Sequence, residues 1–193
     1  MDGRVRSTQR TYVSLLERAS REAVPTLARA LGLERRAAAE AYGVSAGIVL
    51  AGLARAHRRG EAGLRLEGAC GAAGDVDAPE LAIGAHLARP RPDPRLVELL
   101  GDAPDRAGAW LAARTGAQAE VLVRAVAASA PLALCAAARA AAASDLPPWL
   151  AGAEEAPLEE PARLASGRDT GGRAYRCLRR AGMPWFERVL TLV

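Results

Sequence analysis

The residues best suited to acid–base chemistry lie in one short stretch near the middle of the chain. Asp75, Asp77 and Glu80 supply three carboxyl groups, and His86 follows them. Carboxylates with a nearby imidazole could perform general acid–base catalysis if they faced a cavity. The same residue types also serve in turns and at helix N-termini, and Asp75 or Asp77 just before Pro79 fits that role. The structural role is the favoured interpretation, and catalysis is the alternative.

No pattern in the sequence predicts a metal or cofactor site. The acidic group has no i, i+4 pair of ligands that a helix could present to a metal. Cys70, Cys135 and Cys177 are widely spaced and lack a CxxC or Cys/His ligand pattern. Each cysteine lies in an apolar stretch, so we expect all three to be small core residues.

A second set of polar residues could bind a ligand between helices. These candidates lie within, or at the end of, the two most apolar segments: Tyr42, Ser45, Arg55, His57, Ser129 and Arg139. A serine nucleophile needs a positioned base, and the chain has no G-x-S-x-G turn, so the serines more simply satisfy backbone groups. His57 ends a helix, where a cation complements the helix dipole. Arg55 and Arg139 could bind an anion together, although ion-paired or solvated arginines are favoured.

The elements that position these residues are helices. Half of the 193 residues are hydrophobic, but only 4 % are aromatic. The excess is alanine, which has the highest helix propensity, and β-branched residues are sparse. The net charge of +4 arises from 26 basic residues, all arginine, interspersed with 22 acidic ones. This mixture indicates a solvated helix surface rather than a nucleic-acid-binding one. We expect an all-α, multihelical fold.

Local signals predict where the helices begin and end. A first helix is expected from Ser7 to about Ala19 and a second from Arg21 to Leu31. A long apolar helix should follow from Glu34 to Arg58. We expect it to be broken near Gly43–Gly47, because a glycine within a helix costs about 1 kcal/mol relative to alanine. A shorter helix is expected over residues 80–89.

The second half of the chain repeats the first at an offset of 84 residues, which aligns Gly32 with Gly116. The matched pairs are Leu27 and Leu111, Ser45 and Ser129, Leu50 and Leu134, and Arg55 and Arg139. Gly47 aligns with Pro131, and both residue types weaken helices. The pattern predicts two helix–turn–broken-helix repeats packed about a pseudo-two-fold axis.

One segment superficially matches a helix-turn-helix, with Arg35, Arg36 and Glu40 facing a DNA groove. The would-be recognition helix, however, continues into the apolar repeated segment, which a core would bury. A nucleic-acid partner is therefore disfavoured.

The composition divides the chain into a helical domain and a tail. The predicted boundaries are 1–145 for the domain (repeat one 21–74, Pro-rich connector 75–94, repeat two 95–144), 146–172 for a linker or loose loop, and 173–193 for an apolar C-terminal helix. In the favoured interpretation this last helix docks on the domain or exchanges with a twin subunit. Contact of residues 183–193 with a membrane surface is the alternative.

Part of the chain resembles a known bacterial family. LARALGLERRAAAEAYGVSAGIVLAGLARAHRRGEAGLRLEGA is similar to the core of the YidB-like domain family, and LVELLGD and LAARTGAQAEVLVRAVAASAPLALCAAARA resemble its second repeat. The resemblance covers residues 25–143. It implies a duplicated multihelical domain, sometimes attached to cell-envelope modules, without established catalytic residues. The Pro-rich connector and the aromatic tail depart from the family pattern.

These observations predict a non-catalytic binding or assembly module that self-associates as a homodimer. The alternative is an enzyme with an apolar interhelical pocket that acts on a small apolar or anionic metabolite. The N-terminal segment has no signal-peptide core, and no window contains about 18 uninterrupted apolar residues. A cytoplasmic location is therefore expected.

Overall fold

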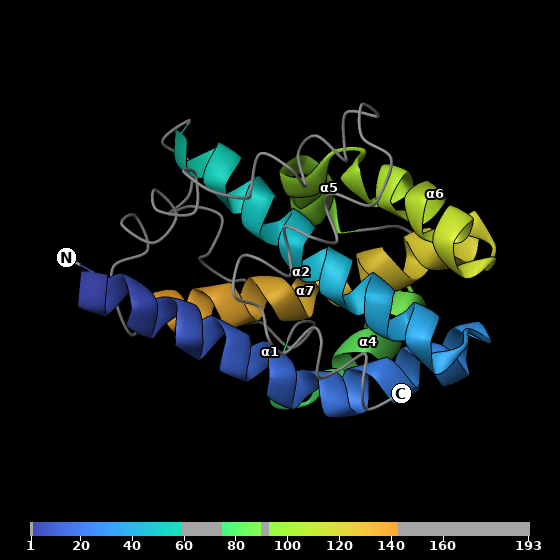
Figure 1. The fold of residues 1–193 in the computed structure, drawn as a ribbon, viewed down its shortest axis with the longest axis horizontal. Coiled ribbons are helices and arrows are strands. Elements are labelled where there is room, and N and C mark those ends of the chain that lie inside the picture. Colours follow the sequence, from blue (N-terminus) through green and yellow to red (C-terminus); the bar gives the residue numbers. More distant parts are fainter. Residues whose placement is uncertain (1, 59–74, 90–92, 143–193) are drawn as a thin grey trace.

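A computed structural model of the chain describes residues 2–58, 75–89 and 93–142. These residues form helices joined by turns, without strands, which confirms the all-α class. The helices are α1 (Asp2–Leu31), α2 (Arg35–Arg58), α4 (Pro79–Leu87), α5 (Pro94–Leu100), α6 (Ala103–Thr115) and α7 (Ala119–Ala142) (Figure 1).

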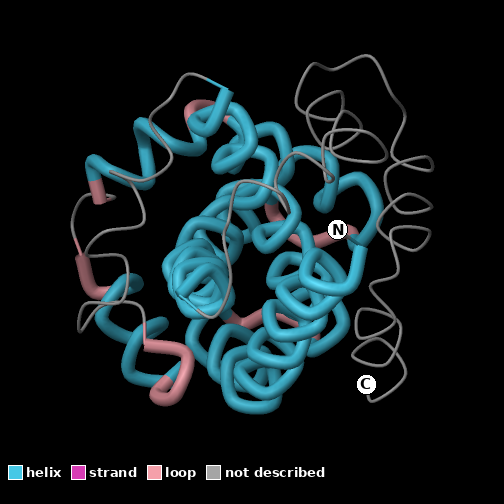
Figure 2. Tube along the Cα trace, turned by 90° about the vertical axis from the view of Figure 1, so that its left-hand side faces the viewer, coloured by secondary structure: helices cyan, strands magenta, loops and turns pink. Residues whose placement is uncertain are grey.

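The core is built around α2 and α7, which pack against each other. α1 contacts both of them, α6 covers the pair from another side, α4 lies against α1 and α7, and α5 lies against α2. Figure 2 views several of these helices nearly end-on, gathered about a common interior. The middle of each central helix is buried on every face, over residues 37–50 of α2 and 128–137 of α7.

Two glycines end the helices that precede α2 and α7. α1 stops before Gly32, which has a φ of +64°, and α6 stops before Gly116, which has a φ of +74°. These left-handed conformations cost glycine little and other residues more, so glycine is the usual helix-ending residue there. The predicted stop at Gly32 is confirmed.

The expected division of the N-terminal segment into two helices is wrong. α1 runs without interruption through Pro25. Its inward face continues across the expected boundary, with buried residues at Tyr12, Leu16, Ala19, Ala23 and Leu27. Packing along this face stabilises one long helix and outweighs the hydrogen bond that Pro25 cannot donate.

The expected helix breaks are also absent. α2 is continuous through Gly43 and Gly47, and α7 is continuous through Pro131. All three residues are buried. The local cost of these residues, about 1 kcal/mol for a glycine and about 3 kcal/mol for a proline, is offset by burial of the apolar residues around them.

The predicted helix over residues 80–89 is present as α4. Pro94 does not end the expected Pro-rich connector but begins α5, where the Asp93 carboxylate accepts a hydrogen bond from the Arg95 backbone N–H at 2.9 Å. Several other expectations lie outside the described residues: those for 59–74, Pro90, Pro92, Cys70, Cys177, and the segments 146–172 and 173–193.

One helix in the described part is long and apolar enough to cross a membrane. It is Ala119–Ala140 within α7, whose most apolar window has a mean hydropathy of 1.9. In this fold 72 % of that window is buried inside the protein, so the segment serves as the central core helix.

Candidate functional site

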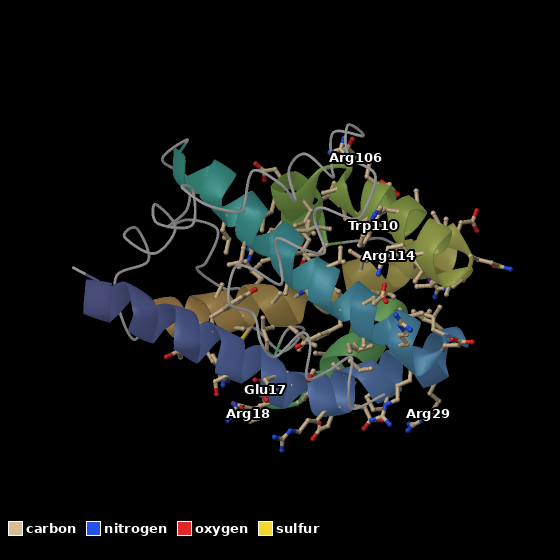
Figure 3. The ribbon with its side chains drawn as sticks, in the orientation of Figure 1. Glu17, Arg18, Arg29, Arg106, Trp110 and Arg114 are labelled. Atoms are coloured by element: carbon tan, nitrogen blue, oxygen red, sulfur yellow. The ribbon has the colours of Figure 1, made fainter. Side chains whose placement is uncertain are left out.

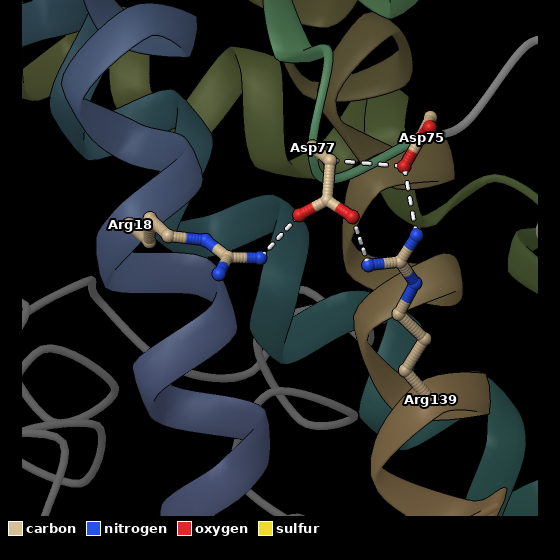
Figure 4. A network of polar contacts seen from close by, with 4 residues as sticks. All are labelled: Arg18, Asp75, Asp77 and Arg139. Carbon is tan, nitrogen blue, oxygen red and sulfur yellow. Dashed lines mark hydrogen bonds and ion pairs between the residues drawn. The ribbon is translucent and has the colours of Figure 1, made fainter.

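The acidic turn before α4 is held between two helices by arginines. Asp77 forms ion pairs with Arg18 of α1 and Arg139 of α7, and Arg139 also reaches Asp75 at 3.0 Å (Figure 4). Asp75 in addition accepts a hydrogen bond from the Asp77 backbone N–H at 2.9 Å, which closes the turn. We call these four residues, Arg18, Asp75, Asp77 and Arg139, the acidic clasp. The predicted turn role of Asp75 is confirmed.

Electrostatics favour the ionised forms of Asp77 and Arg139. The hydrogen bond from Arg139, supported by the charges of Arg139 and Arg18, lowers the pKa of Asp77 below its ordinary value. The hydrogen bond to Asp77 in turn raises the pKa of Arg139. A carboxylate held in this way binds a proton poorly near neutral pH, so Asp77 is suited to tethering helices and unsuited to general acid catalysis.

Asp77→Asn is expected to lower the melting temperature, because the neutral amide loses two ion pairs that join separate helices. The lowered pKa of Asp77 means that its stabilisation is present above the unfolded-state pKa and is lost as the pH falls through the folded-state pKa. The wild type should therefore lose stability in acid more steeply than the variant. Thermal melts between neutral and strongly acidic pH measure both effects.

Asp102→Asn is the matched control for this experiment. Asp102 pairs with Arg106 at 2.6 Å, but both residues belong to the start of α6. A local i, i+4 pair contributes little, so the control should melt close to the wild type. Equal losses in the two variants would contradict the tethering role of Asp77.

The remaining acid–base candidates do not join the clasp. Glu80 pairs with Arg29 of α1 at 3.6 Å on the exposed surface. His86 lies on the inward face of α4 with Pro79, Ala82 and Ile83. Both ring nitrogens of His86 are covered and have no hydrogen-bond partner among the described residues. Glu80 and His86 therefore lie on different faces of the same helix.

The charge state of His86 follows from its surroundings. Burial lowers its pKa, the Arg89 charge lowers it further, and the Asp93 charge opposes the shift. His86 is therefore neutral at neutral pH. Among the described residues, neither ring nitrogen of His86 pairs with a carboxylate, so His86 and the clasp do not form the acid–base group that the sequence suggested as an alternative.

Tyr42 lies in the core and joins α2 to α1. Its hydroxyl donates a hydrogen bond to the Leu16 carbonyl at 3.1 Å, and the Tyr12 hydroxyl donates to the Ala46 carbonyl at 3.2 Å. Each helix thus sends one tyrosine to the backbone of the other. Burial raises the pKa of both phenols, so both stay neutral.

The two repeated serines also bond backbone carbonyls. Ser45 donates to the Val126 carbonyl across the α2–α7 contact, and Ser129 donates to the Ala125 carbonyl in its own helix, each at 2.8 Å. The carbonyl that Pro131 leaves without its helical donor is that of Ala127. Both serines therefore donate hydrogen bonds to backbone carbonyl oxygens, as expected. Neither of these is the Ala127 carbonyl, which loses its helical donor at Pro131.

The other ligand candidates separate in the structure. Arg139 belongs to the acidic clasp, whereas the side chains of Arg55 and His57 lie outside the described part. Cys135 is fully buried, which confirms its expected core role.

The sequence pattern does not indicate that the carboxylate of Glu40 is buried. The Glu40 side chain is only 4 % exposed, and its two oxygens lie 3.4 Å from the Nε atoms of Arg36 and Arg114. The Arg114 guanidinium also lies over the Trp110 ring, 5.0 Å from its centroid (Figure 3). The i, i+4 spacing of Arg36 and Glu40 could have revealed the first pair. Nothing in the local pattern could have revealed Arg114, which lies 74 residues away.

Glu40 therefore tethers α2 to α6 within the core and does not face a DNA groove. Among the described residues, no group of three or more His, Cys, Asp or Glu side chains could hold a metal ion.

The geometry of the described part thus assigns its candidate residues mainly to contacts between helices. In comparisons with known proteins, no family model, no curated protein and no solved structure matches this chain.

Proposed function

We propose that this protein is a non-catalytic helical binding or assembly module. The acidic clasp carries the proposal. Asp75 and Asp77 were the strongest catalytic candidates, and both are engaged by arginines from α1 and α7. Glu40 is engaged by arginines in the same way. Polar residues that form ion pairs between helices make the domain a rigid scaffold, and such a scaffold presents its outer surface to a partner.

We also infer that the scaffold arose by duplication and has a pseudo-two-fold axis between α2 and α7. The element boundaries support this inference. α2 begins at residue 35 and α7 at residue 119, a separation of 84. The helix-ending Gly32 and Gly116 have the same separation. A duplicated fold is a natural scaffold for symmetric assembly.

The resemblance to the YidB-like family supports the same proposal, because that family is a multihelical bacterial one without established catalytic residues. We propose a location in the bacterial cytoplasm. The burial of most of the apolar window in α7 fits this location.

Native mass spectrometry of the protein purified from the cells that make it tests the proposal. We expect masses that correspond to two or more copies of the chain, or to the chain with another protein. A monomer that retains a stoichiometric small metabolite and no protein would contradict the proposal. That result would favour the alternative, a small-molecule enzyme with an apolar interhelical pocket.

A further inference from the structure

α4 lies along one face of α1, and the duplication proposed above places an equivalent face on α6. Asp77, just before α4, pairs with Arg18 of α1. Glu80, in the first turn of α4, pairs with Arg29 of α1. Arg18 and Arg29 are three turns apart and lie in one line along α1. At the offset of 84 residues this line corresponds to residues 102–113 of α6.

Two donors on this face of α6 are buried and have no hydrogen-bond partner among the described residues. They are Arg106 Nε and Trp110 Nε1, which lie one turn apart on α6 (Figure 3). The equivalent of Arg106 on α1 is Glu22, which lies between Arg18 and Arg29 in the line beside α4. Indole and guanidinium N–H groups donate hydrogen bonds and accept none, so this face requires an acceptor from another segment.

The arginine of this face is displaced by one turn relative to α1. The equivalent of Arg18 on α6 is Asp102, but Arg106 pairs with Asp102 through Nη1 at 2.6 Å. This pair neutralises Asp102 and still leaves Arg106 Nε to be bonded. A carboxylate fits the site, because it can accept from a guanidinium and an indole at once, and its bond to the guanidinium is assisted by charge.

The segment after α7 contains a sequence match to the turn before α4. Residues 74–79 read GDVDAP, and residues 152–157 read GAEEAP. The two stretches share the glycine, the alanine, the proline and an acidic residue two positions before the proline, which is Asp77 in one and Glu155 in the other. They lie 78 residues apart, so the connection in the second repeat is six residues shorter than the offset of 84 requires. The match therefore recurs in the same order along both repeats, after α2 and after α7.

The length of chain after α7 allows this segment to reach α6. Ala142 is the last described residue, and Glu155 lies 13 residues further on. Thirteen residues span up to about 43 Å when extended. α7 has 24 residues and is therefore about 36 Å long. Because α6 packs against α7, the segment can reach any position along α6.

We propose that residues 152–157 of the same chain dock on the face of α6 around Arg106 and Trp110, as the turn before α4 docks on α1. Glu155 takes the role of Asp77, and its carboxylate accepts hydrogen bonds from Arg106 Nε and Trp110 Nε1. The inference rests on the proposed duplication and identifies the segment that completes the second repeat. It assigns a contact to part of the stretch whose composition predicts a linker or loose loop.

Quenching of Trp110 fluorescence tests this docking. Trp149→Phe and Trp185→Phe leave Trp110 as the one tryptophan of the three. In that chain Glu155→Ala removes the proposed acceptor, so quenching by acrylamide should increase about twofold or more as the segment leaves the indole. Glu159→Ala is the matched control, because it removes a glutamate just outside the matched stretch, and it should leave the quenching unchanged. Far-ultraviolet circular dichroism checks that the variants keep the same helix content.

Cross-linking identifies which chain supplies the segment. Ala153→Cys is combined with Ala109→Cys at an exposed position of α6, with every native cysteine except the buried Cys135 changed to serine. A short bismaleimide should join this pair within one chain about tenfold faster than the control pair of Ala153→Cys and Ser14→Cys. Ser14 is exposed on α1, which lies across the core from α6 (Figure 1).

The outcomes separate this inference from the proposals on which it rests. Unchanged quenching in Glu155→Ala overturns the docking, and so do equal cross-linking rates for the two cysteine pairs. A cross-link that forms only between two chains also overturns it, because the segment then belongs to a neighbouring copy. In each case the duplication still stands if a crystal structure superposes α1 and α2 on α6 and α7. The assembly function still stands if native mass spectrometry finds a complex with protein.

Discussion

Tyr42→Ala is expected to destabilise the domain by about 3–5 kcal/mol, the usual cost of removing a large aromatic side chain from a core. Tyr42 is 1 % exposed, and its hydroxyl joins α2 to the backbone of α1. The substitution leaves a cavity at the α1–α2 contact and also removes that hydrogen bond. Urea denaturation followed by far-ultraviolet circular dichroism measures the loss.

Tyr42→Phe is the control that separates packing from the hydrogen bond. It keeps the ring and should cost only about 1 kcal/mol. It should also alter the alkaline behaviour. Because burial raises the pKa of Tyr42 above its ordinary value of 10.0, the stabilisation by the neutral phenol is present below about pH 10 and is lost as the pH rises above it. The phenylalanine variant should lose less stability above pH 10, and an unchanged alkaline transition would contradict the core role of the phenol.

Gly108→Ala is expected to destabilise the domain by about 1–3 kcal/mol, the range for overpacking a close contact. The added Cβ would clash with the Val123 side chain and would lie 2.9 Å from the Val123 backbone nitrogen and 3.0 Å from the Ala119 carbonyl oxygen. The two atoms with these distances belong to the backbone of α7, so the clash is relieved only if α6 moves away. Denaturation by guanidinium chloride, compared at an equal dependence of stability on denaturant (m-value), measures the change in the free energy of unfolding.

Gly84→Ala is expected to have the opposite effect on stability from Gly108→Ala. Gly84 is also helical, but a Cβ there meets nothing within 4 Å. The change should stabilise the chain by up to about 1 kcal/mol through helix propensity alone. If both glycine substitutions stabilise the protein, close contact between α6 and α7 at Gly108 is refuted.

The features that were predictable from the sequence are those determined by neighbouring residues. The stop at Gly32, the helix over residues 80–89 and the turn role of Asp75 each depend on a few adjacent positions. The all-α class follows from composition in the same way. Local rules were misleading at Pro25 and Pro131, because they assess a helix without the partners that bury it.

The candidate site depends on contacts between distant residues. Arg18 and Asp77 lie 59 residues apart, and Arg139 and Asp75 lie 64 residues apart. Residue types suggested that Asp75 and Asp77 mattered, and the repeat drew attention to Arg139. No periodic pattern, however, can indicate which arginine meets which aspartate, because that pairing is set by how α1 and α7 cross the turn.

The central position of α7 also has a consequence for synthesis. Among the described helices α7 is the last to leave the ribosome, yet it packs against α1, α2, α4 and α6. Until residues 119–142 emerge, the side of α2 that packs against α7 has no surface against which it can be buried. Folding of the domain must therefore wait until its final core helix has been translated, and the chain should bind chaperones most strongly just before that point.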